Sequence, residues 1–231
     1  MKFRIVLNKS GIIATLSIIM LTVITLYPVS STLTKSAFLG LLILNAAGPY
    51  FIKTKWEKFK IIHSSVIALV VLFFLIRPFT TSRTVPEIYL QNLKSYEGTR
   101  YIWGGENFLG IDCSGLPRKS LISALITKGQ YLKGLEIWWY DCSAKAMSEG
   151  YRNYTIKVCS FNSLRKAEYN LLKPGDLAVT ASGIHVIVYL GNERWIQADP
   201  EQGSVVIEDP VTTSSSWFDT GVNIFRWQAI N

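Results

Sequence analysis

Cys113 is the residue of this 231-residue chain best placed to act as a nucleophile. It lies between Asp112 and Ser114 in the stretch RYIWGGENFLGIDCSG (100–115). The following residues have apolar positions at helical spacing and a proline suited to a first turn, which predicts a helix beginning just after Cys113. Free N–H groups and the helix dipole at that end favour a thiolate, the form that nucleophilic catalysis requires.

His185 is the candidate general base. The chain has two histidines, and His63 lies in a long apolar run, whereas His185 starts the predicted strand HVIVYL. The alternative for Cys113 is a buried structural thiol, since free cysteines are among the most buried residues. The combination of Cys113 with a single nearby candidate base favours the catalytic interpretation.

Two polar residues compete for the role of orienting His185. The predicted strand RWIQAD follows HVIVYL after a Gly191-Asn192 turn, so the two strands should form a hairpin. Gln197 and Asp199 share one face of the second strand, and either could accept the imidazole N–H, as the third member of a triad does. Because hairpin register is not determined by the sequence, both remain candidates.

Four motifs in order carry a family resemblance: YIWGG (101–105), GIDCSG (110–115), LKPGDLAV (172–179) and HVIVYLGNERWIQA (185–198). Together they resemble the NlpC-type family of papain-like cysteine endopeptidases, which cut bacterial cell-wall peptides. The resemblance covers roughly residues 86–198. It implies Cys113 as nucleophile and His185 as base, and it places Gln197 in the third position, where the family more often has histidine.

The resemblance also implies a substrate. Residues beside the nucleophile of these enzymes bind the free amino end of a peptidoglycan stem peptide, which points to Asp112 and Ser114 and to cleavage between D-glutamate and a diamino acid. For Asp112 a helix cap is an equally good interpretation. We expect Tyr101 and Trp103 to line the cleft.

Periodicity along residues 86–231 predicts an α+β domain. Apolar spacing predicts a helix from Pro86 to about Gly98, then the nucleophile helix to about Gly129 and a further helical stretch. Six strands should follow: YTIKVC, DLAVTA, HVIVYL, RWIQAD, SVVIE and VNIFRW. Helices followed by a small antiparallel sheet are an α+β arrangement, and the resemblance implies the papain-like version of it.

The N-terminal third predicts a membrane anchor. Uncharged apolar stretches at 11–27, 36–52 and 61–76 are read as three transmembrane helices, and a polar linker (79–85) separates them from the hydrolase domain. Residues 1–78 hold nine basic residues and one acidic residue, whereas the rest of the chain holds 15 of each. The excess positive charge therefore lies in the predicted membrane anchor, where basic residues mark the inner side of the membrane. A nucleic-acid partner is excluded.

The positions of the lysines predict orientation. Positive charge before the first span and in the second link places both inside, so the domain should face the exterior or periplasmic side of the bacterial cytoplasmic membrane. The expected partners are the lipid bilayer and a peptidoglycan peptide. Rival functions are an amidase or acyltransferase of the same superfamily, and a membrane-anchored binding module without catalysis.

Cys142 and Cys159 complete the cysteine inventory. With one histidine and no CxxC pair in the domain we expect neither a metal site nor a cofactor. In an exported domain these two cysteines could form a disulfide and leave Cys113 as the free thiol.

Overall fold

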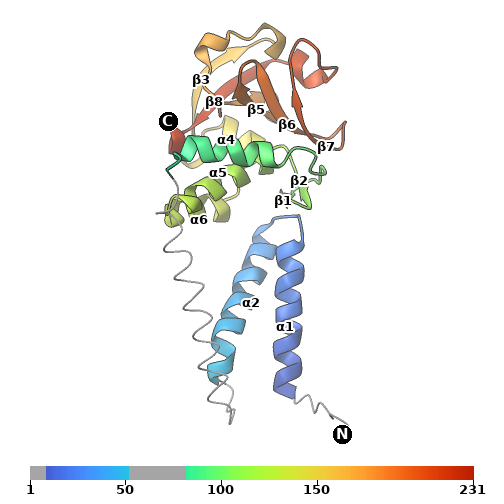
Figure 1. Cartoon of the computed structure of the whole chain (residues 1–231), viewed down its shortest axis with the longest axis vertical. Coiled ribbons are helices and arrows are strands. Elements are labelled where there is room, and N and C mark those ends of the chain that lie inside the picture. The colour runs from blue at the N-terminus through green and yellow to red at the C-terminus, as the bar shows by residue number, and fades with distance from the viewer. Residues whose placement is uncertain (1–8, 52–81) are drawn as a thin grey trace.

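The computed structural model describes residues 9–51 and 82–231 of the chain (Figure 1). Its N-terminal part is a helical hairpin formed by α1 (Lys9–Leu26) and α2 (Thr32–Phe51). The two helices lie side by side, and the Ser17 hydroxyl donates a hydrogen bond of 3.1 Å to Asn45 Oδ1 across the pair. Asn45, which sequence patterning places in an apolar span, therefore has a polar partner within the hairpin.

The structure does not support the predicted transmembrane spans at 11–27 and 36–52. Within residues 9–51 and 82–231, no helix combines the length and the apolar content needed to cross a bilayer. The third predicted span, 61–76, lies outside the described residues.

Four helices of the second part precede the sheet. Helix α4 (Val85–Ser95) begins with a capping box in which Thr84 and Glu87 satisfy free N–H groups of the first turn. Helix α5 (Gly115–Thr127) follows Cys113 directly and is buried on nearly all sides, as expected for a central core helix. Helices α6 (Tyr131–Trp139) and α7 (Ala144–Ser148) follow α5 in the chain and precede the strands of the sheet.

All six predicted strands are present and form one antiparallel sheet in the order β3-β8-β4-β5-β6-β7. Their bounds are β3 Thr155–Phe161, β4 Leu177–Thr180, β5 Val186–Gly191, β6 Arg194–Asp199, β7 Ser204–Glu208 and β8 Val222–Trp227. A small hairpin of β1 (Glu106–Asn107) and β2 (Gly110–Ile111) precedes the nucleophile helix. Short 3-10 helices occupy the loops: η2 Tyr151–Asn153, η3 Leu164–Lys166, η4 Tyr169–Leu171, η5 Ser216–Asp219 and η6 Gln228–Ile230. The α+β class is confirmed.

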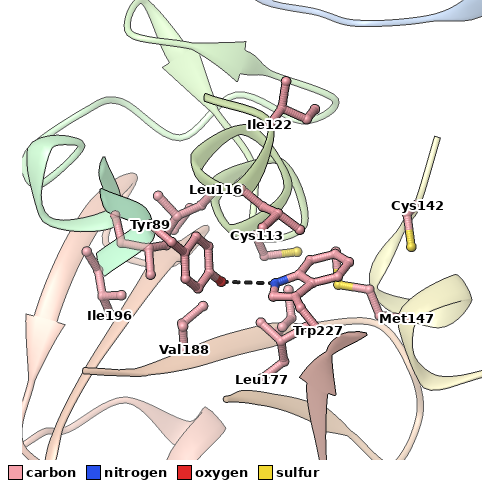
Figure 2. Close-up of a cluster of buried hydrophobic side chains, with 14 of the residues drawn as sticks. Tyr89, Cys113, Leu116, Ile122, Cys142, Met147, Leu177, Val188, Ile196 and Trp227 are labelled. Atoms are coloured by element: carbon pink, nitrogen blue, oxygen red, sulfur yellow. Dashed lines mark hydrogen bonds between the residues drawn. The ribbon is translucent and has the colours of Figure 1, made fainter. Parts of the chain in front are cut away.

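Helices α4 and α5 cover one face of this sheet, and loops cover the other (Figure 1). Val186 and Val188 of β5 pack into the helix-side core, while Ile187 and Tyr189 pack into a second cluster on the opposite face. Because both faces of β5 are covered, its residues are apolar without alternation. Figure 2 shows the helix-side core, where the Trp227 indole donates a hydrogen bond of 3.1 Å to the Tyr89 hydroxyl.

All three cysteines are free thiols, so the possible disulfide between Cys142 and Cys159 is not formed. The physical reason is their placement on opposite sides of the sheet. Cys142 is buried in the helix-side core, whereas Cys159 on β3 packs against the second cluster.

The turn of the helical hairpin docks on the loop before Cys113. The Ser30 N–H donates to the Gly104 carbonyl at 2.8 Å, and the Glu106 N–H donates to the Pro28 carbonyl at 2.9 Å. The Asn107 side chain adds hydrogen bonds to the carbonyls of Leu26 and Tyr27. The N-terminal hairpin is therefore joined to residues 104–107, a few positions before Cys113.

Candidate active site

Cys113 lies immediately before α5, as predicted, and Asp112 organises the turn around it. Asp112 Oδ1 accepts hydrogen bonds from the Gly115 N–H at 2.5 Å and from the Ser114 hydroxyl at 3.0 Å. Its Oδ2 accepts from the Gly104 N–H at 2.8 Å. The carboxylate thus caps free N–H groups at the helix start and ties them to the preceding loop.

The sulfur of Cys113 contacts the backbone on both sides of His185. It lies 3.9 Å from the Ile184 carbonyl oxygen, and the Val186 N–H is directed at it. Figure 2 shows Cys113 at the start of its helix beside core side chains such as Leu116. The topology therefore brings the end of the loop before α5 to the first residues of β5.

The expectation of a stable thiolate is wrong for the resting protein. Cys113 is only 6% exposed, and this burial, together with the negative charge of Asp112, raises the pKa of its thiol to about 12. N–H groups of Val186, Ser114 and Cys113 itself oppose the effect, but less strongly. Loss of water around the sulfur outweighs the helix terminus, so Cys113 is a neutral thiol at pH 7.

His185 is held by both its backbone and its ring. Its N–H donates to the Thr180 hydroxyl at 3.1 Å, and its carbonyl accepts from the Thr180 N–H at 3.0 Å. The Trp217 indole stacks on the imidazole with ring centroids 4.2 Å apart and an interplanar angle of 17°. His185 is 2% exposed, and this burial lowers its pKa despite the opposing influence of Gln197 and two carboxylates.

Gln197, and not Asp199, makes the contact with His185. Gln197 Oε1 lies 2.6 Å from His185 Nε2, which leaves Nδ1 as the ring nitrogen that Gln197 does not contact. Asp199 contacts Gln197 and not the imidazole: its Oδ2 accepts a hydrogen bond of 3.3 Å from Gln197 Nε2. The register of β5 with β6 does not by itself select Gln197, because Val188 pairs with Ile196 and the same offset sets Asp199 opposite His185. The contact of the Gln197 side chain with the imidazole decides between the two candidates.

The four residues predicted to bind substrate differ in their distance from Cys113 and in their exposure to solvent. Asp112 and Ser114 adjoin Cys113 and bond to each other. Tyr101 is half-buried beside them, and burial with the nearby Cys113 and Asp112 raises the pKa of its phenol. Trp103 is 79% exposed and belongs to the surface of the same loop.

Three residues around His185 were not predicted: Trp217, Ser215 and Glu208. Ser215 and Glu208 both approach Gln197 Nε2, at 3.2 and 2.5 Å. Trp217 and Ser215 come from the loop after β7, far along the chain from His185. Their types alone carry no signal, although alternation along β7 could have placed Glu208 on the same face as Gln197 once the register was known.

A cysteine at the start of a buried helix, next to a histidine on an antiparallel sheet, defines the papain-like class of cysteine-peptidase domains. Residues 98–223, more than half of the chain, match the NlpC/P60 family, and the chain belongs to that family. Members of this family are cysteine peptidases and peptidoglycan hydrolases. No curated protein gives a significant match.

Several solved structures match part of this chain. The P60 domain of an antigen from M. avium subspecies paratuberculosis is 20% identical, with a TM-score of 0.39; the match covers 64% of this chain and 96% of that one. The peptidoglycan hydrolase RipB from Mycobacterium tuberculosis is 21% identical, with a TM-score of 0.40, and covers 64% and 65% of the two chains. An NlpC/P60 protein from Bacillus cereus is 19% identical, with a TM-score of 0.42 and coverage of 62% and 40%.

Proposed function

We propose that the protein is a cysteine peptidase that hydrolyses an amide bond in peptidoglycan stem peptides, with Cys113 as nucleophile, His185 as base and Gln197 as the orienting residue. The observation that carries this proposal is the contact of the Cys113 sulfur with the backbone on both sides of His185, whose Nε2 is occupied by Gln197. These contacts bring the proposed nucleophile, base and orienting group into one part of the fold, which supports their roles in acyl transfer.

The reaction begins from a neutral pair. As the sulfur attacks the substrate carbonyl, its proton passes to His185 Nδ1, and the backbone N–H of Cys113 stabilises the developing oxyanion. His185 then gives this proton to the leaving amine, and the C–N bond breaks to leave a thioester on Cys113. A water molecule, deprotonated by His185, attacks the thioester, and the returning proton restores the thiol as the acid product leaves.

The acidic and hydroxyl groups beside Cys113 support a substrate with a free amino end. Asp112 already accepts three hydrogen bonds, and an ionised carboxylate has about four acceptor positions. Its remaining capacity, together with Ser114, would bind the amine, and Tyr101 and Trp103 would line the path. The family resemblance, which implies this amine-binding role, is the basis for proposing the bond between D-glutamate and a diamino acid.

Incubation of the full-length protein with purified muropeptides tests the proposal. Mass spectrometry of the products should show cleavage at a D-glutamyl–diamino acid bond by the wild type and none by Cys113→Ala or His185→Ala. Cleavage by all three proteins, or by none across several stem peptides, would reject the peptidase function. The variants must have wild-type circular dichroism spectra for the comparison to count.

The burial of Cys113 favours one second candidate, a domain that binds stem peptides without cutting them. In that case the wild type would bind a muropeptide and release no product. Isothermal titration alongside the product analysis separates binding alone from binding with turnover.

The exposed apolar surface of the N-terminal part supports a location at a membrane, and the distribution of basic residues in the sequence is the basis for proposing the exterior or periplasmic side. Large apolar side chains are exposed on both hairpin helices, and exposed apolar surface of this kind marks a site for lipid or protein. They are Leu16, Ile18, Ile19, Met20, Val23, Leu26, Leu33, Leu42, Ile43 and Leu44. We place the boundary between this anchor (1–78) and the hydrolase domain (86–231) at the linker 79–85. Membrane fractionation and protease accessibility in intact cells test both statements.

A further inference from the structure

A carboxylate that the mechanism does not use, Glu208 on β7, contacts the residue that orients His185. The register of β6 with β7 pairs Gln197 with Val206 and Trp195 with Glu208, which makes Gln197 and Glu208 diagonal neighbours on one face. Glu208 Oε2 accepts a hydrogen bond of 2.5 Å from Gln197 Nε2.

The two ends of the Gln197 amide are not equivalent. Its oxygen only accepts hydrogen bonds and its nitrogen only donates them, while an ionised carboxylate only accepts. Three acceptors surround the nitrogen: Glu208 at 2.5 Å, Ser215 at 3.2 Å and Asp199 at 3.3 Å. If the amide were reversed, its oxygen would face carboxylate oxygens inside a site that is closed to water, since Gln197 is fully buried.

Glu208 is itself fixed in place. Its other oxygen, Oε1, accepts hydrogen bonds from the Thr213 hydroxyl at 2.5 Å and from Gln202 Nε2 at 3.0 Å. Asp199 holds the amide less directly, because its contact with Gln197 is longer and its oxygens also accept from the Glu201 N–H and the Ser215 hydroxyl. Of the two carboxylates, Glu208 makes the shorter bond to the Gln197 nitrogen.

The direction of the amide determines which nitrogen of His185 carries the proton. With Oε1 turned toward the ring, His185 Nε2 must be the donor at 2.6 Å, so Nδ1 is left without a proton. An unprotonated Nδ1 is what the removal of the proton from Cys113 requires.

We propose that Glu208 is a positioning residue which, by orienting the amide of Gln197, sets His185 in the tautomer that can accept the proton of Cys113. The proposal rests on the proposed peptidase function and extends it by one residue. It concerns the neutral imidazole, which burial favours in this site.

Nitrogen-15 NMR of the histidine ring tests this assignment. Full-length protein labelled at histidine and carrying His63→Gln has His185 as its single imidazole, and the ring nitrogen shifts distinguish a protonated from an unprotonated nitrogen. With Glu208 in place, at a pH above the pKa of His185, the imidazole should have a protonated Nε2 and an unprotonated Nδ1. A protonated Nδ1 overturns the proposal, whatever the variants do.

Variants at Glu208 provide the second arm. Glu208→Gln offers the amide of Gln197 both a donor and an acceptor, so both His185 tautomers should appear and kcat should fall about 10-fold with KM unchanged. Glu208→Asp should restore most of the wild-type spectrum. Glu201→Gln, the same chemical change at an exposed residue of the preceding turn, is the matched control and should resemble the wild type.

The outcomes separate the two proposals. If Glu208→Gln keeps the wild-type tautomer and the kcat of Glu201→Gln, the role of Glu208 is refuted while the peptidase function stands. If the wild type cleaves no muropeptide, the peptidase function fails, and the NMR spectra still decide whether Glu208 sets the tautomer.

Discussion

The protonation state of Cys113 gives a quantitative prediction for its chemical reactivity. The pKa of this thiol is about 12, against 9.0 for an ordinary thiol. At pH 7 its thiolate fraction is therefore roughly 1000-fold lower than that of a free cysteine. A more basic thiolate is more nucleophilic, with a Brønsted coefficient of about 0.4–0.5, which recovers roughly 15- to 30-fold. Alkylation by iodoacetamide should thus be about 30- to 60-fold slower than for a small free thiol, and shielding by the core slows it further.

Peptide mapping by mass spectrometry measures this rate for each cysteine separately. The alkylation rate of Cys113 should rise about tenfold per pH unit between pH 6 and 9, because only the thiolate fraction changes. Cys142, a buried thiol of the same core whose pKa burial raises to about 11, is an internal control and should behave similarly. Rapid alkylation of Cys113 at pH 6, with a plateau up to pH 8, would show a thiolate–imidazolium pair and refute the reasoning.

Three further predictions concern pH, stability and the hairpin contact. Burial lowers the pKa of His185, so the imidazole is the neutral base over most of the pH range. The value of kcat/KM should therefore fall only below about pH 6.5 and stay level to about pH 9. A decline near pH 8 would contradict a neutral pair of Cys113 thiol and His185 imidazole. Asp176→Asn leaves the largely buried Arg226 without its carboxylate and should lower the free energy of unfolding by about 3 kcal/mol in urea titrations. Asp219→Asn, at an exposed ion pair that water screens, should have a much smaller effect, and equal effects would be inconsistent with burial as the cause. Asn107→Asp removes the donors to the hairpin turn, so hydrogen exchange at the Glu106 amide should accelerate about tenfold; an unchanged rate would show that the turn does not depend on this side chain.

Local patterns predicted the elements of the domain well. Each strand from β3 to β8 is a run of apolar or alternating residues bounded by turn residues, and these signals depend only on neighbouring positions. The position of Cys113 at a helix start follows equally from its neighbours, as does the hairpin that brings His185 and Gln197 together. The residues of the candidate site could therefore be named in advance.

Properties that depend on tertiary packing could not be predicted. The pKa of Cys113 is set by burial that many distant segments create, and it opposes the helix-terminus argument drawn from local sequence. The choice between Gln197 and Asp199 required the positions of their side chains relative to the His185 ring. Glu208 and Trp217 reach His185 or its partner from segments with no recognisable motif, so only the folded chain reveals them.

The two N-terminal helices show a different limit. Apolar runs correctly predicted helices near 11–27 and 36–52, but neither helix combines the length and the apolar content needed to cross a bilayer. The contacts of the turn between them with residues 104–107 had no signal in the sequence. They join the N-terminal part to the loop that supports Asp112.

Trapping of the acyl-enzyme tests the central claim most directly. Full-length protein mixed with a cleavable muropeptide, quenched in acid within the first turnover and digested, should give a fragment containing Cys113 that has gained the mass of the acyl half of the substrate. The Cys113→Ala protein should show neither the adduct nor product. Release of product by Cys113→Ala at the wild-type rate, without any adduct on Cys113 in the wild type, would contradict the account.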